Sequence, residues 1–334
     1  MGVKRKSSLL ILTVLIAMAF PHKSEVPYAA PAQKQVAPEH LLFVTNEAFG
    51  ISFRNPLGVF YDNHHDEILV ADTGNHRVVI LDGAEGYAKS AFTHWVRRAG
   101  VDKAILGEPR SIAVNSSSEI FIVDNLCEYV EVCDFRGTPL TRISLEEYMQ
   151  PVEVSSGFDL KPVAVTVDPK DNLYIATSSS IYVFNNDLQF QRQLGSKGYK
   201  SSEFIAIMSL WVDSAGKIFV TDGQGLGLRV LAPDGEVLLA FGGHDAGFDN
   251  FSLPYGVITD RRGYIWVSDS LRHITTIFDA DGKFLDYIGS FGSKVGQFAY
   301  PSGVATDRDG KIAVLERVGA RLQCFELAQP LTEG

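Results

Sequence analysis

Val70-Ala-Asp-Thr-Gly-Asn-His-Arg-Val-Val-Ile-Leu-Asp82 is the stretch that decides the fold of this chain. One apolar strand ends at Asp72, a polar turn follows, and a second apolar strand leads to Asp82. The turn residues Asp, Thr, Gly and Asn tolerate left-handed backbone or bond to their own main chain, which is typical of a tight hairpin. The stretch is also a template, because close variants of it recur along the chain.

Copies of the hairpin recur along the chain with the same distance between their two strand ends. Five copies carry an acid where the first strand ends, and the second strand closes ten positions later in each of them. A sixth copy, from Ala176 to Asn185, is two residues shorter and has no acid. The sequence therefore contains six units, and the five acids, which we call the repeat acids, are Asp72, Asp124, Asp222, Asp269 and Glu316.

An Asp or Asn residue precedes each copy of the hairpin and also indicates six units. This landmark residue follows an apolar run and begins a tight turn, and successive landmark residues are 53, 53, 45, 47 and 47 positions apart. Periods of this length with several short β-rich runs are typical of propeller blades, and the runs are too short and too rich in Val, Ile, Phe and Tyr for helices. The landmark residues are Asp62, Asn115, Asp168, Asp213, Asp260 and Asp307.

Each unit can be written as four antiparallel strands. In the fifth unit we expect them at Tyr255–Thr259, Tyr264–Ser268, Ile274–Phe278 and Phe284–Gly289. Consecutive apolar residues within the strands indicate that each blade packs against neighbours on both faces. The sixth unit lacks an outer strand, whereas Leu41–Thr45 aligns with one. We therefore expect an all-β, six-bladed propeller of four-stranded antiparallel blades, closed by the N-terminal strand that completes the last blade.

Residues 1–20 have the pattern of a signal peptide, with Lys4-Arg5-Lys6 before an apolar core and Ala17-Met-Ala19 as a cleavage site. The apolar core is shorter than the about 20 residues that a membrane-spanning helix needs. We therefore expect an exported protein, periplasmic or extracellular, with no stable membrane span after cleavage. A flexible Pro- and Ala-rich leader is expected over 21–40, the propeller over 41–327, and a tail over 328–334.

At this point the residues carry a family resemblance. Ala71-Asp-Thr-Gly-Asn-His-Arg-Val78, preceded by Asn55-Pro-Leu-Gly-Val59, resembles the NHL repeat of a six-bladed propeller family, here in a bacterial exported form. Leu253-Pro-Tyr-Gly-Val257 and Tyr300-Pro-Ser-Gly-Val304 match the opening motif of that repeat as well. The resemblance implies a scaffold, and such scaffolds host binding proteins and enzymes alike.

The repeat acids allow two interpretations. They could form a ring of metal-binding carboxylates, or each could accept hydrogen bonds from backbone N–H groups of its own turn, helped by Arg77 in the first unit. The acid is present in five of the six units, whereas catalysis needs one site. We therefore expect a structural role, with no catalytic residue and no metal ligand among the repeat acids.

Propeller ligands usually bind around the central channel, where the innermost strands begin. The NHL-like peptidyl-hydroxyglycine lyases hold zinc there with three His, and the corresponding positions of this sequence include none. The calcium-dependent lactonase propellers need convergent Glu, Asn and Asp, and Glu108 is the acid that we can place nearby. We therefore expect no cofactor at these positions, which are Leu57, Arg110, Val163, Met208, Tyr255 and Ser302.

The histidines outside the channel do not indicate an enzyme either. His64-His65 is expected in a solvated hairpin turn on the opposite face. His76 and His273 occupy the same turn position in the first and fifth units, which favours a role in the repeat over a pair of ligands.

Varied loops lead into the innermost strands and carry aromatic residues that could form a binding surface. We expect a non-enzymatic binding or scaffold module for a protein, peptide or glycan partner at the channel mouth. The alternative is a propeller hydrolase or lyase with a metal at the central channel. The net charge of −10, without a basic cluster, is unfavourable for nucleic acid. The expected ligand-binding residues are Arg110, Tyr255, Glu108, Phe158 and Phe251.

Overall fold

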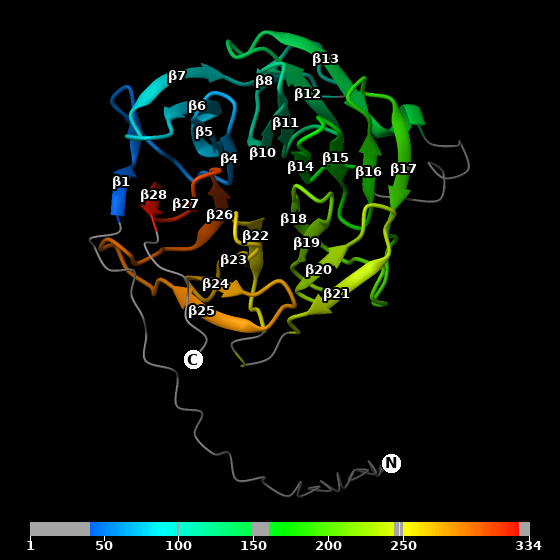
Figure 1. The fold of residues 1–334 in the computed structure, drawn as a ribbon. Helices are drawn as coiled ribbons and strands as arrows, with labels where there is room; N and C mark the ends of the chain where they lie inside the picture. The colour runs from blue at the N-terminus through cyan, green and yellow to red at the C-terminus, as the bar shows by residue number, and fades with distance from the viewer. Residues whose placement is uncertain (1–40, 99, 149–159, 244–246, 248–249, 327–334) are drawn as a thin grey trace, which may run out of the picture. The chain divides into compact units, whose positions relative to one another are not determined.

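The computed structural model describes residues 41–98, 100–148, 160–243, 247 and 250–326. Their strands form six four-stranded antiparallel blades and two short hairpins (Figure 1). This confirms the all-β, six-bladed propeller expected from the repeat. The predicted signal peptide at 1–20, the leader at 21–40 and the tail at 328–334 lie outside the described residues.

The strands of each blade follow one another from the channel outwards. Blade 1 contains β4 (Gly58–Asp62), β5 (Glu67–Asp72), β6 (Arg77–Asp82) and β7 (Ala88–Thr93). Blade 2 contains β10 (Pro109–Val114), β11 (Ile120–Asp124), β12 (Tyr129–Cys133) and β13 (Pro139–Ser144). Blade 3 contains β14 (Ala164–Val167), β15 (Leu173–Ala176), β16 (Ile181–Phe184) and β17 (Phe190–Leu194).

The second half of the ring continues in the same way. Blade 4 contains β18 (Ile207–Val212), β19 (Ile218–Asp222), β20 (Leu228–Leu231) and β21 (Val237–Phe241). Blade 5 contains β22 (Pro254–Thr259), β23 (Ile265–Asp269), β24 (Ile274–Phe278) and β25 (Phe284–Ile288), close to the expected bounds. Blade 6 contains β26 (Pro301–Thr306), β27 (Lys311–Glu316), β28 (Arg321–Glu326) and, outermost, β1 (Leu41–Thr45).

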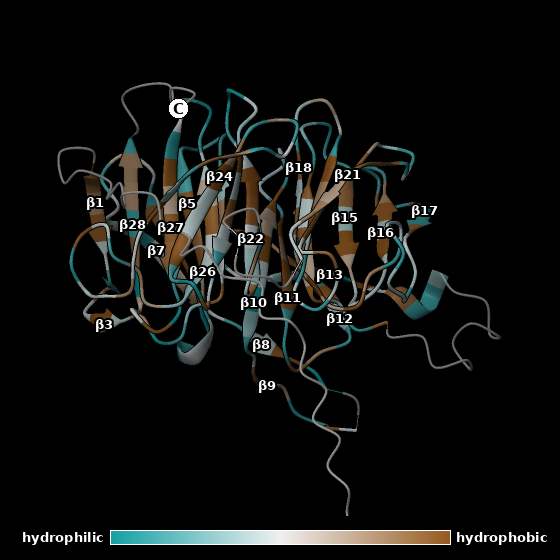
Figure 2. Ribbon diagram, turned by 90° about the horizontal axis from the view of Figure 1, so that it is seen from below, coloured by the Kyte–Doolittle hydropathy of each residue, from teal (hydrophilic) through white to brown (hydrophobic). Residues whose placement is uncertain are grey.

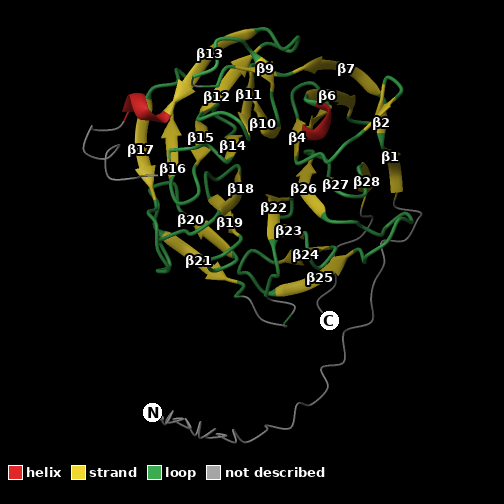
Figure 3. Cartoon of the chain, turned by 180° about the vertical axis from the view of Figure 1, so that it is seen from behind, coloured by secondary structure: helices red, strands yellow, loops and turns green. Residues whose placement is uncertain are grey.

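The ring is continuous around its axis. Each innermost strand neighbours the next, and β26 neighbours β4, so the first and last blades are in contact. In the last blade β1 pairs antiparallel with β28, with Phe43 opposite Cys324 and Thr45 opposite Leu322. Apart from the 3-10 turns η2 (Thr73–Asn75) and η3 (Leu145–Tyr148), the described chain consists of strands and loops (Figure 3).

The hydrophobic core is divided among the blade interfaces. Six clusters of buried residues are present among the described residues, and each combines side chains from two adjacent blades. Ile68 of blade 1 and Leu315 of blade 6, for example, belong to one cluster. Both faces of a blade are therefore buried, which explains why its strands are apolar on consecutive residues.

The two faces of the propeller carry different connections. One face holds the loops into the innermost strands and the turns between second and third strands, and we call it the loop face. The hairpins β2 (Glu47–Ala48)–β3 (Ile51–Ser52) and β8 (Trp95–Val96)–β9 (Ile105–Leu106) extend from it, with β3, β8 and β9 along the lower edge of Figure 2. The opposite face holds the tight turns after the first and third strands, and we call it the turn face.

Candidate functional site: the loop face

The repeat acids lie where second strands reach the loop face, and each is buried. In blade 1, Asp72 accepts a hydrogen bond from the backbone N–H of Arg54 at 2.8 Å and one from Nε of Arg77 at 2.7 Å. Arg54 belongs to the loop that leads into the innermost strand of the same blade. The carboxylate therefore ties this loop to the hairpin, as the structural interpretation of the acids requires.

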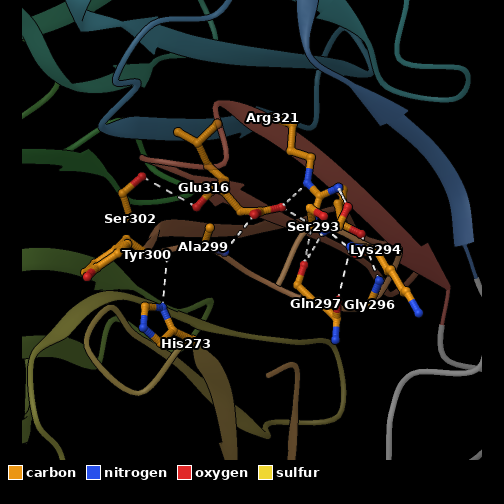
Figure 4. A network of polar contacts seen from close by, with 12 residues as sticks. His273, Ser293, Lys294, Gly296, Gln297, Ala299, Tyr300, Ser302, Glu316 and Arg321 are labelled. Atoms are coloured by element: carbon orange, nitrogen blue, oxygen red, sulfur yellow. Dashed lines mark hydrogen bonds and ion pairs between the residues drawn. The ribbon is translucent and has the colours of Figure 1, made fainter. Parts of the chain in front are cut away.

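Three other blades repeat the arrangement. Asp222 accepts from the backbone N–H groups of Ile205 and Ala206, each at 3.0 Å. Asp269 accepts from those of Ser252 and Leu253, at 2.6 and 3.0 Å. In blade 6, Glu316 accepts from the N–H of Ala299 at 2.8 Å and from Nε of Arg321 at 2.6 Å (Figure 4).

The arginines beside these acids extend into the same loops. Arg77 donates to the carbonyls of Ala48 and Ile51, at 3.2 and 2.9 Å. Arg321 donates to the carbonyls of residues 293, 294 and 297 (Figure 4). Arg229 and Arg272 reach the carbonyls of Ser201 and Gly247. An acid–arginine pair thus fixes both the N–H and the C=O groups of a loop, a charge-assisted arrangement that limits loop motion.

Blades 2 and 3 depart from this pattern. Tyr129 stands in blade 2 where Arg77 stands in blade 1, and Nε2 of the buried His94 lies 3.4 Å from Asp124. Blade 3 has Thr177 in place of the acid, and its hydroxyl accepts weakly from the N–H groups of Ser179 and Ser180, at 3.4 and 3.2 Å. Both blades keep four strands without an arginine paired to a repeat acid.

Burial affects the protonation of several groups on this face. Desolvation raises the pKa of Glu316, even though Arg321 and Gln323 donate to its carboxylate and oppose the shift. Desolvation lowers the pKa of Arg229, opposed by Asp222. It also lowers the pKa of His273, whose Nδ1 accepts the backbone N–H of Tyr300 at 3.1 Å (Figure 4).

The channel mouth on the loop face is narrow. The six positions expected to surround it, Arg110 and Tyr255 among them, line a cavity of about 50 Å³. A cavity of this size has room for a few water molecules. A peptide or glycan therefore could contact Arg110 and Tyr255 from outside, but the cavity cannot enclose it.

The other predicted mouth residues have different surroundings. Phe251 is 1% exposed and packs edge-on against Phe278, so our prediction of a contact residue is corrected to a packing role. Glu108 does not line the mouth cavity, and its backbone carbonyl accepts the N–H of Asn125. Phe158 lies outside the described residues.

The opposite end of the axis widens into a cavity of about 390 Å³ on the turn face, which sequence reasoning missed. The landmark acids that line it were expected only as turn formers, and they do serve their own turns. Asp307, for instance, accepts from the N–H groups of Asp309, Gly310 and Lys311. Within the described ranges, no cluster of three or more His, Cys, Asp or Glu residues could hold a metal ion.

Large exposed apolar side chains are concentrated on the loop face. Elsewhere among the described residues they are few, on β1, the outer strands and the turn face. Some of the loops that carry them are joined by hydrogen bonds, since Arg317 bonds to Asn55 and the N–H of Val318 bonds to Ala299. The loop-face residues are Phe49, Ile51, Trp95, Val101, Leu106, Tyr199, Leu226, Leu271, Phe291, Val295 and Val318.

The described residues include no helix long and apolar enough to cross a membrane. The three cysteines are buried and unpaired, and burial raises the pKa values of Cys133 and Cys324 to about 12. Their thiols are thus poor nucleophiles, in keeping with small buried apolar residues.

Comparison with solved structures shows what this architecture is similar to. A Bacteroides thetaiotaomicron protein of unknown function has a TM-score of 0.58 at 17% identity, over 85% of this chain and 72% of its own. Virginiamycin B lyase from Staphylococcus aureus has a TM-score of 0.56 at 10% identity, over 86% and 99%. Hydrazine synthase from Kuenenia stuttgartiensis has a TM-score of 0.56 at 11% identity, over 85% and 98%. These similarities support the fold alone.

No curated protein matches the sequence significantly. The NHL repeat family matches residues 53–81, which include the hairpin from which the repeat was recognised and its buried Asp72–Arg77 pair. The chain is thus a six-bladed β-propeller with a recognisable NHL repeat at residues 53–81, in its first blade.

Proposed function

We propose that this propeller is an exported binding module that recognises a partner protein or peptide on its loop face, where it performs no catalysis. The observation that carries the proposal is the concentration of exposed apolar side chains there. Phe291 is 67% exposed, Val318 63% and Ile51 52%. Exposed apolar groups that are clustered and rimmed by polar ones are typical of protein interaction sites.

The fixed loops support the same proposal. Arg77 holds the backbone of Ile51, and Arg321 holds the segment between Phe291 and Phe298. Because these loops are already ordered by buried ion pairs, a partner would not have to order them on binding. The narrow mouth is consistent with a ligand that lies across the loop face, since about 50 Å³ cannot enclose a substrate.

Matched surface variants test the proposal. In the loop-face variant Ile51, Phe291 and Val318 are all replaced by Ser, and in the control Tyr87 and Phe135, which are 54% and 55% exposed on the turn face, are replaced by Ser. Partners retained by the immobilised wild-type protein are identified by mass spectrometry and their affinities measured. Each lost hot-spot contact should cost at least about 1 kcal/mol, so the triple variant should bind more than 100-fold more weakly.

The control variant should bind like the wild type, and circular dichroism should show that both variants are folded. Equal affinity in the loop-face variant and the wild type would contradict the proposal. Stoichiometric zinc or calcium in the purified protein, together with turnover of a lactone or phosphodiester, would replace it with the enzymatic alternative.

A further inference from the structure

Three side chains meet on the turn face between blades 1 and 2. His65 follows Asp62 in the turn between β4 and β5, and Ser118 lies in the turn between β10 and β11, 53 residues from His65. Nδ1 of His65 is 2.6 Å from Oδ2 of Asp62, and Nε2 is 3.3 Å from Oγ of Ser118. A carboxylate on one ring nitrogen and a serine hydroxyl on the other is the connectivity of a Ser-His-Asp triad, which is recognised by geometry and not by sequence order.

The carboxylate is placed to orient the ring. Asp62 is 3% exposed, and its second oxygen accepts the backbone N–H of His64 at 2.9 Å. With the Nδ1 proton of His65 directed at Asp62, the lone pair on Nε2 can accept the hydroxyl proton of Ser118. The side chain of His65 is 45% exposed, so a solvent-borne substrate can approach the pair.

Ser118 has an unusual backbone conformation. Its φ of 62° is left-handed, as is that of the equivalent Asp171 in blade 3 at 61°, whereas blades 4, 5 and 6 have glycines there, Gly216, Gly263 and Gly310. A non-glycine residue in this conformation is uncommon and costs free energy, so the turn must hold Ser118 in place. The turn is held by Ser116, whose N–H donates to Asp171 of blade 3 at 2.9 Å.

A cavity of about 310 Å³ lies beside the three residues, and all three line it. Its remaining wall is mainly apolar, with Leu69, Ile80 and Ile120 inside and the 55%-exposed Phe135. Glu67 also lines it, paired with Lys89. An uncharged apolar group fits this wall, whereas an anionic group would meet the carboxylates of Asp62 and Glu67.

From this geometry we infer that Ser118, His65 and Asp62 form a catalytic triad that hydrolyses esters with small apolar acyl groups. The Ser118 oxygen attacks the ester carbonyl carbon while its proton passes to Nε2 of His65. The carbon–oxygen bond to the leaving group then breaks, and the alcohol departs with that proton. Water, deprotonated by His65, next attacks the acyl-serine, and the proton returns to Ser118 as the carboxylic acid is released.

The donors near Ser118 limit the range of substrates. The backbone N–H groups of Ser117, Ser118 and Glu119 all donate to Asn115, so they are not available to a developing oxyanion. Ser90 is a hydroxyl donor that lines the same cavity. One missing oxyanion donor typically lowers kcat by about 100- to 1,000-fold. Activated aryl esters are therefore the expected substrates, and amides are not.

Covalent labelling of the full chain with a fluorophosphonate probe tests the inference directly. The wild type should be labelled at Ser118, as located by peptide mass spectrometry, and should hydrolyse p-nitrophenyl butyrate. Ser118→Ala should abolish both, and His65→Gln should slow both by about 100-fold or more, because general-base catalysis is lost. The adjacent residues supply the controls: Ser117→Ala and His64→Gln should behave as the wild type.

Labelling that persists in His65→Gln, or that falls on another serine, would overturn the triad. So would a wild-type rate no higher than that of Ser118→Ala. Thermal unfolding of all four variants separates loss of reactivity from loss of fold. The result is independent of partner binding, because none of these residues lies on the loop face.

Discussion

At the scale of single residues, one sequence position serves different purposes in different blades. Asp72 and Glu316 pair with an arginine and hold a loop, whereas Asp124 faces a histidine. His76 and His273 both have left-handed backbone, with φ of 59° and 61°. Nδ1 of His76 lies 2.7 Å from the carbonyl of Gly107, to which it can donate, but Nδ1 of His273 accepts an N–H. The turn conformation is therefore the same in these blades, whereas the hydrogen-bond partner of the side chain differs from blade to blade.

Arg77 provides a test of the buried pairs. Its side chain is 9% exposed and that of Asp72 is 0% exposed. Arg77→Leu leaves a buried carboxylate without its cation, so the free energy of unfolding in urea should fall by about 3 to 5 kcal/mol. Lys200→Met is the control, since the 82%-exposed Lys200 side chain forms a solvent-screened pair with Glu203. Equal losses in both variants would show that the buried pair has no special role.

His273 predicts a dependence of stability on pH. Burial lowers its pKa below the ordinary 6.5, so the folded state binds this proton less readily than the unfolded state. The stability contributed by neutral His273 is complete above pH 6.5 and is lost as the pH falls from there through the folded-state pKa. Between about pH 7 and 5, urea midpoints should fall less for His273→Gln than for the wild type. If the urea midpoints of His273→Gln and the wild type fell equally with pH, His273 would not be the source of this dependence. His64→Gln, in an exposed turn, is the control.

At the scale of elements, the outer strand of blade 6 comes from the other end of the sequence. β1 is paired with β28, so Phe43 lies opposite Cys324 and both belong to the same apolar cluster. Blade 3 shows that a blade can lose its acid and keep four strands, because the hydrogen bonds between strands and the two apolar interfaces remain.

A cross-link tests whether β1 closes the ring in solution. Residues opposite each other in antiparallel strands have Cα atoms about 4.5–5.5 Å apart, within the range of disulfides. Phe43→Cys should therefore form a disulfide with Cys324 during oxidative refolding, detected as a loss of 2 Da and a faster band on a non-reducing gel.

Val44→Cys is the matched control for this cross-link. Val44 lies opposite Gln323, so its side chain points to the other face of the blade and should not reach Cys324. Failure of Phe43→Cys to cross-link, or equal cross-linking of both variants, would show that β1 is not held in this register.

At the scale of the whole molecule, the propeller has two chemically different faces. The loop face bears most of the exposed apolar side chains of the described residues, and the turn face bears the wider axial cavity and the Ser118–His65–Asp62 group. The two proposals use opposite faces, so a bound partner and a reacting ester would not compete for one surface.

Metal removal tests the role of the acids in the whole molecule. The repeat-acid carboxylates accept hydrogen bonds from backbone N–H groups of their own blades, so we expect them to act without a shared ion. Dialysis against EDTA should leave the thermal unfolding midpoint unchanged. A midpoint that falls on chelation and returns with calcium would support the metal-ring interpretation, because a ligand bound only to the folded state raises its stability.

Several features could be read from the sequence because they are local. The spacing of the repeat acids and of the landmark residues marked the blades, and the strands of blade 5 lie within about one residue of the expected bounds. The positions around the channel mouth could also be counted, because they recur near the start of each innermost strand, one residue after a proline in five of the six units. Phe251 could not be assigned correctly, since an aromatic residue in a loop can be exposed or packed and only neighbouring strands decide between them.

The sequence by itself determined six β units, their strands and the buried acid at most blade edges, because hydrophobic pattern and turn chemistry act over a few residues. Only the tertiary structure decided what lies across a blade interface. Packing blade 1 against blade 2 brings Ser118 to His65, and the ring places the exposed Ile51, Phe291 and Val318 on the same face. These neighbours depend on how each blade is rotated relative to the next. That rotation cannot be predicted from the spacing of residues along the chain.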